Sequence, residues 1–180
     1  MKQFALPSQI NGGEIRILRN RLELTQAEMA QLCGVSKKTI ERWETDKKPL
    51  TGAIVPLVEL LLHTPAIAKR LEIPPRKTKL RLYYMDDDHI CTIIDVDEPK
   101  HEIEIVNYAT DPQKRAFGRV EYPSFDEYEQ FLESRCFPRT RDKMKIMLDA
   151  LDLPFYDPIQ IIEKTQGRMA EDDQWIRIER

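Results

Sequence analysis

One short segment, residues 25–44, constrains the fold more than any other, because it holds two helix starts on either side of a single glycine. Thr25 and Glu28 have the spacing of a capping box, in which each side chain bonds the other residue's backbone amide. Ser36 has the N-cap position of a second helix over 37–44. Gly34 lies between them, where the chain must turn sharply and where glycine tolerates a left-handed backbone. The segment therefore predicts two short helices joined by a tight turn.

Further helices are predicted on both sides of this pair. Apolar residues recur at helical spacing after a Gly12-Gly13 break, which predicts a first helix from Glu14. Leu50–Leu62 is predicted to be a closing helix, and it is more apolar than one buried face requires. Two explanations of the surplus leucines are equally favoured: they form a dimer interface, or they pack over the domain's own hydrophobic core. The apolar positions of the first helix are Ile15, Leu18, Leu22 and Leu24.

These motifs resemble the helix-turn-helix of Xre or lambda-repressor-type regulators over about residues 14–62, and they are similar to the DNA-binding half of MqsA-type antitoxins. The resemblance implies that Ile40 and Trp43 occupy the buried side of a recognition helix. Two features depart from the family pattern: Cys33 replaces an aliphatic residue, and Thr45-Asp46 replaces the usual glycine. The segments that carry the resemblance are Ile15–Arg19, Leu24–Ala30, Gly34–Ser36 and Ile40–Glu44.

The resemblance implies that the outward side chains of the recognition helix enter the major groove of DNA. Lys38 and Arg42 are one helical turn apart and are predicted to read base edges, with Arg42 suited to guanine. Lys37 and Thr39 are predicted to reach either bases or the backbone. The alternative, a merely solvated basic face, is disfavoured by the motif around these residues.

Three further residues are predicted to hold phosphates of the DNA backbone. Gln26 matches the position that performs this role in the resembled family. Lys47 and Lys48 follow the recognition helix and are predicted from their charge alone.

The charge of the chain is unevenly divided. Residues 1–78 hold 13 Lys/Arg and 8 Asp/Glu, a net of +5, whereas residues 79–180 hold 15 and 23, a net of −8. This asymmetry favours a first part that meets a polyanion and a second that does not. The alternative is two solvated surfaces of different sign. From the asymmetry together with the resemblance, we expect the N-terminal part to bind double-stranded DNA. A homodimer joined by the surplus leucines of 50–62 suits half-sites about 34 Å apart.

The proline-rich segment 73–78 cannot continue a helix and predicts a stiff basic linker. The expected architecture has two domains, an all-α helix-turn-helix domain over 1–72 and an acidic α+β domain over 79–180. Period-2 alternation in the second domain predicts a β-meander over 79–85, 89–96 and 101–108, and a terminal edge strand over 174–179. Helices are predicted from Phe125, over about 140–151, and from Pro158 to a stop at Gly167.

The C-terminal segments 133–141 and 167–176 resemble a module of Firmicute and prophage proteins that is also found beside HipA-like kinases, although the kinase motifs are absent. Four arginines in these segments predict an anion or partner patch. The favoured alternative is that Asp172 and Asp173 pair with them internally. The arginines are Arg135, Arg139, Arg141 and Arg168.

Metal, cofactor and enzyme chemistry are disfavoured. The run Asp86–His89 is predicted to be a solvated hairpin, because consecutive turn residues point in different directions. Cys33, Cys91 and Cys136 form no Cys-x-x-Cys pair, which indicates a reducing compartment. A nucleophilic Cys136 is disfavoured because no histidine lies near it in the sequence.

The expected function is that of a sequence-specific DNA-binding regulator, a dimeric repressor or autoregulator. No apolar run approaches the roughly 20 residues of a membrane span, so we expect a cytoplasmic protein with no membrane partner. The alternative is an antitoxin or phage-encoded inhibitor, whose acidic domain binds a protein target while the helix-turn-helix autoregulates its operon.

Overall fold

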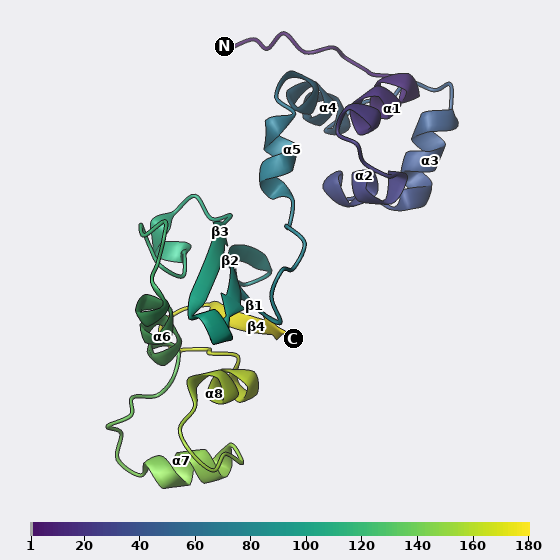
Figure 1. Ribbon diagram of the computed structural model, residues 1–180. Coiled ribbons are helices and arrows are strands. Elements are labelled where there is room, and N and C mark those ends of the chain that lie inside the picture. The colour runs from purple at the N-terminus through teal and green to yellow at the C-terminus, as the bar shows by residue number, and fades with distance from the viewer. Residues whose placement is uncertain (1) are drawn as a thin grey trace. The chain divides into compact units, whose positions relative to one another are not determined.

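The computed structural model describes residues 2–180. Their contacts divide the chain into two compact units, with the boundary in the sequence between Ile73 and Pro74 (Figure 1). The first unit is all-helical, and the second combines a four-stranded antiparallel sheet with helices, as the sequence predicts. None of the helices in residues 2–180 is both long and apolar enough to cross a bilayer.

Five helices form the first unit around one apolar core. The side chains of Ile15, Leu18, Met29, Ile40 and Val58 are completely or almost completely inaccessible to solvent, and each of the first four helices contributes to this core. The helices are α1 (Gly12–Arg21), α2 (Gln26–Leu32), α3 (Lys37–Thr45), α4 (Ile54–His63) and α5 (Ala66–Leu71).

The predicted turn between α2 and α3 is present. The Thr25 hydroxyl accepts from the Glu28 amide at 3.3 Å, and the Glu28 carboxylate accepts from the Thr25 amide at 2.7 Å, which completes the capping box. Gly34 has a φ of +65°, in the left-handed region that glycine adopts without strain. Ser36 caps α3 by accepting from the Thr39 amide at 3.2 Å. Local sequence chemistry therefore sets the two helix starts and the turn.

Two boundaries in the first unit differ from the prediction. The Gly12-Gly13 break is wrong, because both glycines belong to α1 and Asn11 caps that helix through its own capping box with Glu14. The closing helix begins at Ile54 and not at Leu50, because Leu50 pairs with Ile10 in an antiparallel bridge, with N···O distances of 2.7 and 3.0 Å. A bridge partner this far away in the sequence cannot be seen in a local pattern.

The apolar surplus of α4 is divided between two environments. Val55, Val58 and Leu61 are buried in the unit's own core, whereas Leu60 is 59% exposed. The short helix α5, which the sequence patterns do not predict, also leaves Ile67 and Leu71 exposed.

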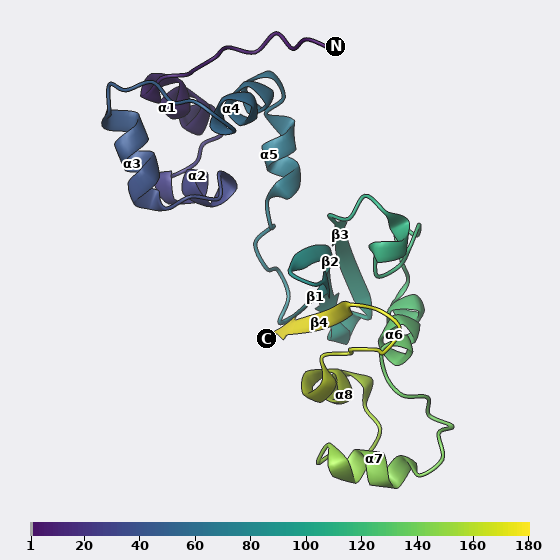
Figure 2. The same cartoon turned by 180° about the vertical axis from the view of Figure 1, so that it is seen from behind.

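The second unit is built on a sheet with strand order β3-β2-β1-β4 (Figure 2). The predicted meander and the terminal edge strand are both present, and β4 pairs antiparallel with β1 from Arg81 opposite Glu179 to Asp86 opposite Gln174. The strands are β1 (Leu80–Asp86), β2 (His89–Asp97), β3 (Glu102–Asn107) and β4 (Gln174–Glu179). The 3₁₀ segments are η1 (Glu98–Lys100) and η2 (Pro112–Lys114), and the helices are α6 (Phe125–Ser134), α7 (Met144–Ala150) and α8 (Pro158–Thr165).

One face of the sheet carries the main core of this unit. Leu82, Ile94 and Ile176 are buried there against α6 and α8, which supply Leu132 and Ile161 among other residues. The predicted start of α7 near residue 140 is wrong, because Lys143 has a φ of +61° and the helix begins only at Met144. The difference has a local cause, since a left-handed residue interrupts the helical hydrogen-bond ladder.

The opposite face of the sheet holds a buried ion pair between neighbouring strands. Arg81 of β1 binds Asp95 of β2 through two hydrogen bonds of 2.7 and 2.6 Å, and it also donates to the Pro74 carbonyl at 2.8 Å. Arg76 lies 3.6 Å from Glu179, and Lys77 lies 2.8 Å from Glu104. The segment from Pro74 onward is therefore held to this sheet, and its basic residues are paired within the second unit.

Candidate nucleic-acid interface

The helix α3 has one buried side and one basic, exposed side. Ile40 is fully buried and Glu44 is 8% exposed, and their spacing of four residues places both on the side that faces the core. Lys38 and Arg42 lie on the exposed side, as the sequence reading expects. This arrangement fixes the helix through one side and leaves the other open to a ligand.

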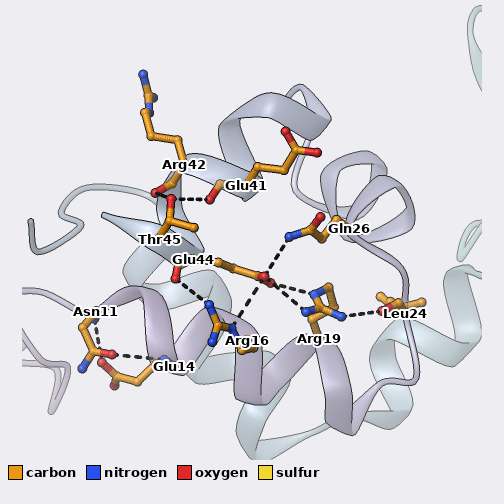
Figure 3. Close-up of polar contacts among 10 residues, drawn as sticks. All are labelled: Asn11, Glu14, Arg16, Arg19, Leu24, Gln26, Glu41, Arg42, Glu44 and Thr45. Carbon is orange, nitrogen blue, oxygen red and sulfur yellow. Dashed lines mark hydrogen bonds and ion pairs between the residues drawn. The ribbon is translucent and has the colours of Figure 1, made fainter. Parts of the chain in front are cut away.

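The four predicted base-reading residues differ in how free their side chains are. No hydrogen bond or ion pair within residues 2–180 holds the side chains of Lys38 and Arg42, and Figure 3 shows Arg42 extending away from the buried network. The ammonium of Lys37 is 3.4 Å from the Glu41 carboxylate one turn later. The Thr39 hydroxyl is 2.9 Å from the Ser36 hydroxyl at the helix cap. Lys38 and Arg42 are therefore the most available of the four.

A network of charged and polar side chains around Glu44 connects α1, α2 and α3 (Figure 3). Arg19 of α1 binds the Glu44 carboxylate at 2.6 and 3.2 Å, and Gln26 of α2 donates to it at 2.9 Å. Arg16 donates to the Glu44 carbonyl at 2.8 Å and lies 3.8 Å from its carboxylate. The Glu44 side chain is only 3% exposed, so three helices share one buried anion.

The electrostatics of this network favour the ionised carboxylate. The hydrogen bond from Arg19 is the largest influence, and it lowers the pKa of Glu44 against the opposing effect of burial. The same pairing raises the pKa of Arg19. Because the charged forms of Glu44 and Arg19 stabilise each other, the network stabilises the position of α3 relative to α1 and α2.

The sequence patterns predict no partners for Arg16 and Arg19, and they do not predict the role of Glu44. A signal was present, because Glu44 follows Ile40 by one helical turn and so had to face the core, where an acidic residue needs a partner. Gln26, predicted to hold a phosphate, points into this network. Its amide group has a second N–H, so the bond to Glu44 orients the side chain and still leaves a donor.

The two predicted phosphate-binding lysines lie in the exposed loop after α3. The Lys48 backbone amide donates to the Asp46 carboxylate at 3.1 Å, which orders the loop while the lysine side chain stays exposed. Lys47 is likewise exposed.

The four arginines of the second unit have separate partners. Arg135 is 6% exposed and is bound by both Asp172 carboxylate oxygens at 2.6 and 3.0 Å, and by the Gly167 and Gln174 carbonyls. Arg139 pairs with Glu133, and the Arg168 guanidinium stacks 5.0 Å from the Trp175 ring centre. Arg141 is exposed. The internal pairing of Arg135 with Asp172 is the alternative that the sequence favours.

The acidic run Asp86–His89 forms the hairpin between β1 and β2. Asp87 has a φ of +52° and its carbonyl accepts from the Trp175 indole at 2.7 Å, while Asp86 pairs with Lys114. Across residues 2–180, no group of three or more His, Cys, Asp or Glu side chains is arranged to hold a metal ion. Burial raises the pKa of the Cys136 thiol to about 12, the opposite of what a nucleophile needs.

Comparison with known proteins adds one match to this geometry. Residues 12–72 match the family model described as a helix-turn-helix domain, a span that runs from the first residue of α1 to the residue after α5. Comparison with curated proteins and with solved structures gives no match. Residues 12–72 therefore form a helix-turn-helix domain, which indicates a regulator that binds DNA.

Proposed function

We propose that this chain is a sequence-specific transcriptional regulator of the Xre type, acting in the cytoplasm as a dimeric repressor or autoregulator. The observation that carries the proposal is the two-sided character of α3. Its inner side is fixed by Ile40 and by the Glu44 network, and its outer side offers Lys38 and Arg42, whose side chains have no partner among residues 2–180.

In the proposed mechanism α3 enters the major groove, where Arg42 makes a bidentate contact to guanine and Lys38 contacts an adjacent base. Lys37 and Thr39 make secondary contacts, because both side chains already have neighbours on the helix. Gln26, Lys47 and Lys48 bind phosphates and set the depth and angle of α3. The Glu44 network keeps α3 rigid, which reduces the ordering cost of binding.

The acidic second unit is proposed to assemble the dimer or to bind a protein partner, with no enzymatic role. Its residues 79–180 carry a net charge of −8, which disfavours contact with DNA and suits a basic partner. The same charge supports the second candidate function, an antitoxin or phage-encoded inhibitor similar to the MqsA type. In that case the acidic unit sequesters a protein, and the helix-turn-helix domain only autoregulates.

The test is a fluorescence-anisotropy titration of the full chain onto its own upstream DNA and onto a scrambled duplex, at several salt concentrations. Lys38→Ala and Arg42→Ala are expected to weaken specific binding by about 1 to 3 kcal/mol each and to bring it close to non-specific binding. Arg70→Ala, an exposed charge deletion on α5, is the matched control. Equal binding of the wild type to both duplexes would contradict a regulator that recognises its own promoter.

A further inference from the structure

The second unit contains a pocket of about 370 Å³ that the proposed DNA-binding function does not use. One face of α6 forms one wall, and the start of α8 with the preceding loop forms the other. Phe125, Tyr128, Phe155 and Tyr156 supply aromatic surface to its lining. Aromatic faces carry negative electrostatic potential, so such a lining favours an organic cation over an anion.

The charged residues of the lining point to the same kind of ligand. Four carboxylates line the pocket and only one basic residue does, which leaves a net charge of −3. Within residues 2–180, Glu98 and Glu129 have no cationic partner for their side chains, and both are exposed. Asp157 caps α8, and Glu133 pairs with the single basic residue, Arg139.

A buried hydroxyl without a partner belongs to the same lining. Tyr128 is 2% exposed, and its hydroxyl oxygen makes no hydrogen bond within the described part of the chain. The charged groups that act on this hydroxyl are Glu98, Glu129 and Asp157, which all line the pocket. Tyr128 thus lines the pocket and carries a buried hydroxyl without a hydrogen-bond partner in the described residues, which costs free energy unless a donor reaches it.

Arg139 shows which ligand chemistry the pocket accepts. Its guanidinium carbon lies 4.7 Å from the centre of the Tyr156 ring, and its nitrogens bind the Glu133 carboxylate at 2.6 and 2.8 Å. The residue is exposed and lies in the loop between α6 and α7, so its position is held by these two contacts. Arg139 thus acts as an internal guanidinium between a tyrosine face and a carboxylate.

From the aromatic lining, the excess of carboxylates and the unused Tyr128 hydroxyl, we propose that this pocket binds a guanidinium group from outside the chain. The incoming group displaces or joins Arg139, stacks on Tyr156, pairs with Glu98 and Glu129, and donates to Tyr128. The group belongs either to a small guanidinium compound or to an arginine side chain of a polypeptide. The site is separate from the helix-turn-helix domain and does not depend on the proposed DNA binding.

The test uses amide chemical shifts of the isotope-labelled full chain during titration with four probes. Propylguanidinium is compared with propylurea, which has a similar size and no charge. A capped Gly-Arg-Gly peptide is compared with capped Gly-citrulline-Gly. Saturable shifts at Leu132 and Ile159 with a guanidinium probe, and none with its uncharged counterpart, are the expected result. Binding of propylguanidinium supports a small-molecule source, and binding of the peptide alone supports a polypeptide source.

Variants separate this site from general charge attraction. Glu129→Gln and Glu98→Gln are each expected to weaken the affinity for the guanidinium probe about 3- to 10-fold. Arg139→Ala is expected to increase the affinity by a similar factor, because it removes the internal competitor. Tyr128→Phe is expected to weaken binding and also to stabilise the fold, because it removes an unsatisfied buried hydroxyl. Glu121→Gln removes an exposed acidic charge outside the pocket and is the matched control.

Two results would overturn the proposal. The first is equal shifts with the charged and uncharged probes, or no saturable shift with any of the four. The second is equal weakening by Glu121→Gln and Glu129→Gln, because that pattern indicates attraction to the acidic surface as a whole.

Discussion

Gly12 of α1 lies directly against the backbone of Trp43 in α3, so closely that a Cβ atom on Gly12 would stand 1.9 Å from the Trp43 carbonyl oxygen. Real Cβ atoms do not approach a backbone oxygen to this distance. The absence of a side chain at position 12 therefore allows α1 to pack against α3, and the same contact places Arg16 and Arg19 beside Glu44.

We expect Gly12→Ala to destabilise the first unit by about 1 to 3 kcal/mol, because the added methyl group forces two helix backbones apart. Urea unfolding of the full chain measures this through Trp43 fluorescence, in a Trp175→Phe background so that only the first unit reports. Gly13→Ala is the matched control, because its Cβ meets no backbone atom and only the Asn11 side-chain oxygen that caps α1, so its loss reports the cap and not the packing of two helices. A loss for Gly12→Ala no larger than that for Gly13→Ala would contradict the close-packing explanation.

The contrast between these two glycines shows what the sequence can predict. Features with both partners in one short segment were predictable, including the Thr25 capping box, the Gly34 turn and the alternation of the strands. The sequence predicts a helix break at Gly12, because the residue that requires a glycine there, Trp43, is far away in the sequence. The bridge between Ile10 and Leu50 was missed for the same reason.

In the candidate site too, some features can be predicted from one segment and others depend on residues far apart in the sequence. The outward residues of α3 follow from helical spacing around Ile40, so Lys38 and Arg42 could be predicted from the sequence. The Glu44 network and the pairing of Arg135 with Asp172 join elements that only the folded chain brings together.

Stability of the first unit is expected to depend on the charge of Glu44. Its pKa is lowered in the folded state, so its contribution is complete above the ordinary value of 4.5 and is lost as pH falls through the folded value. Glu44→Gln is expected to cost about 2 to 3 kcal/mol at pH 7 and to lose less stability than the wild type on acidification.

Urea midpoints followed by Trp43 fluorescence at several pH values between 7 and 3 test this expectation. The pKa of Glu28 is also lowered, by its hydrogen bonds with Thr25. Both the wild type and Glu44→Gln therefore contain this second acid-sensitive group. The difference between the wild type and Glu44→Gln isolates the part that belongs to Glu44. Parallel acid profiles for the two proteins would show that the carboxylate makes no net contribution.

Lys48 is expected to act on DNA without sequence preference, because it lies in the exposed loop after α3. Lys48→Ala should make the slope of the log binding constant against log salt concentration shallower by about 1. It should also weaken binding to the specific and the scrambled duplex by the same factor. Anisotropy titrations at four or more salt concentrations give the slope. A loss confined to the specific duplex would mean that Lys48 contacts a base.

Arg135 is expected to be a structural residue of the second unit, and its replacement by lysine tests this directly. A lysine keeps the charge but loses the planar fork that binds both Asp172 oxygens and two carbonyls. We expect Arg135→Lys to destabilise this unit by about 2 to 4 kcal/mol, measured through Trp175 fluorescence in a Trp43→Phe background.

Asp172→Asn supplies the control for Arg135→Lys. If the two residues stabilise the fold through each other, the double variant is less destabilised than the two single losses predict together. Asp172 has a lowered pKa because of its bonds to Arg135, so the difference between wild type and Arg135→Lys should shrink as acid protonates this carboxylate. An anion-binding role for Arg135 instead requires that phosphate stabilise the wild type and not Arg135→Lys, with little difference between them in its absence. That result would mean that Arg135 belongs to an anion-binding surface.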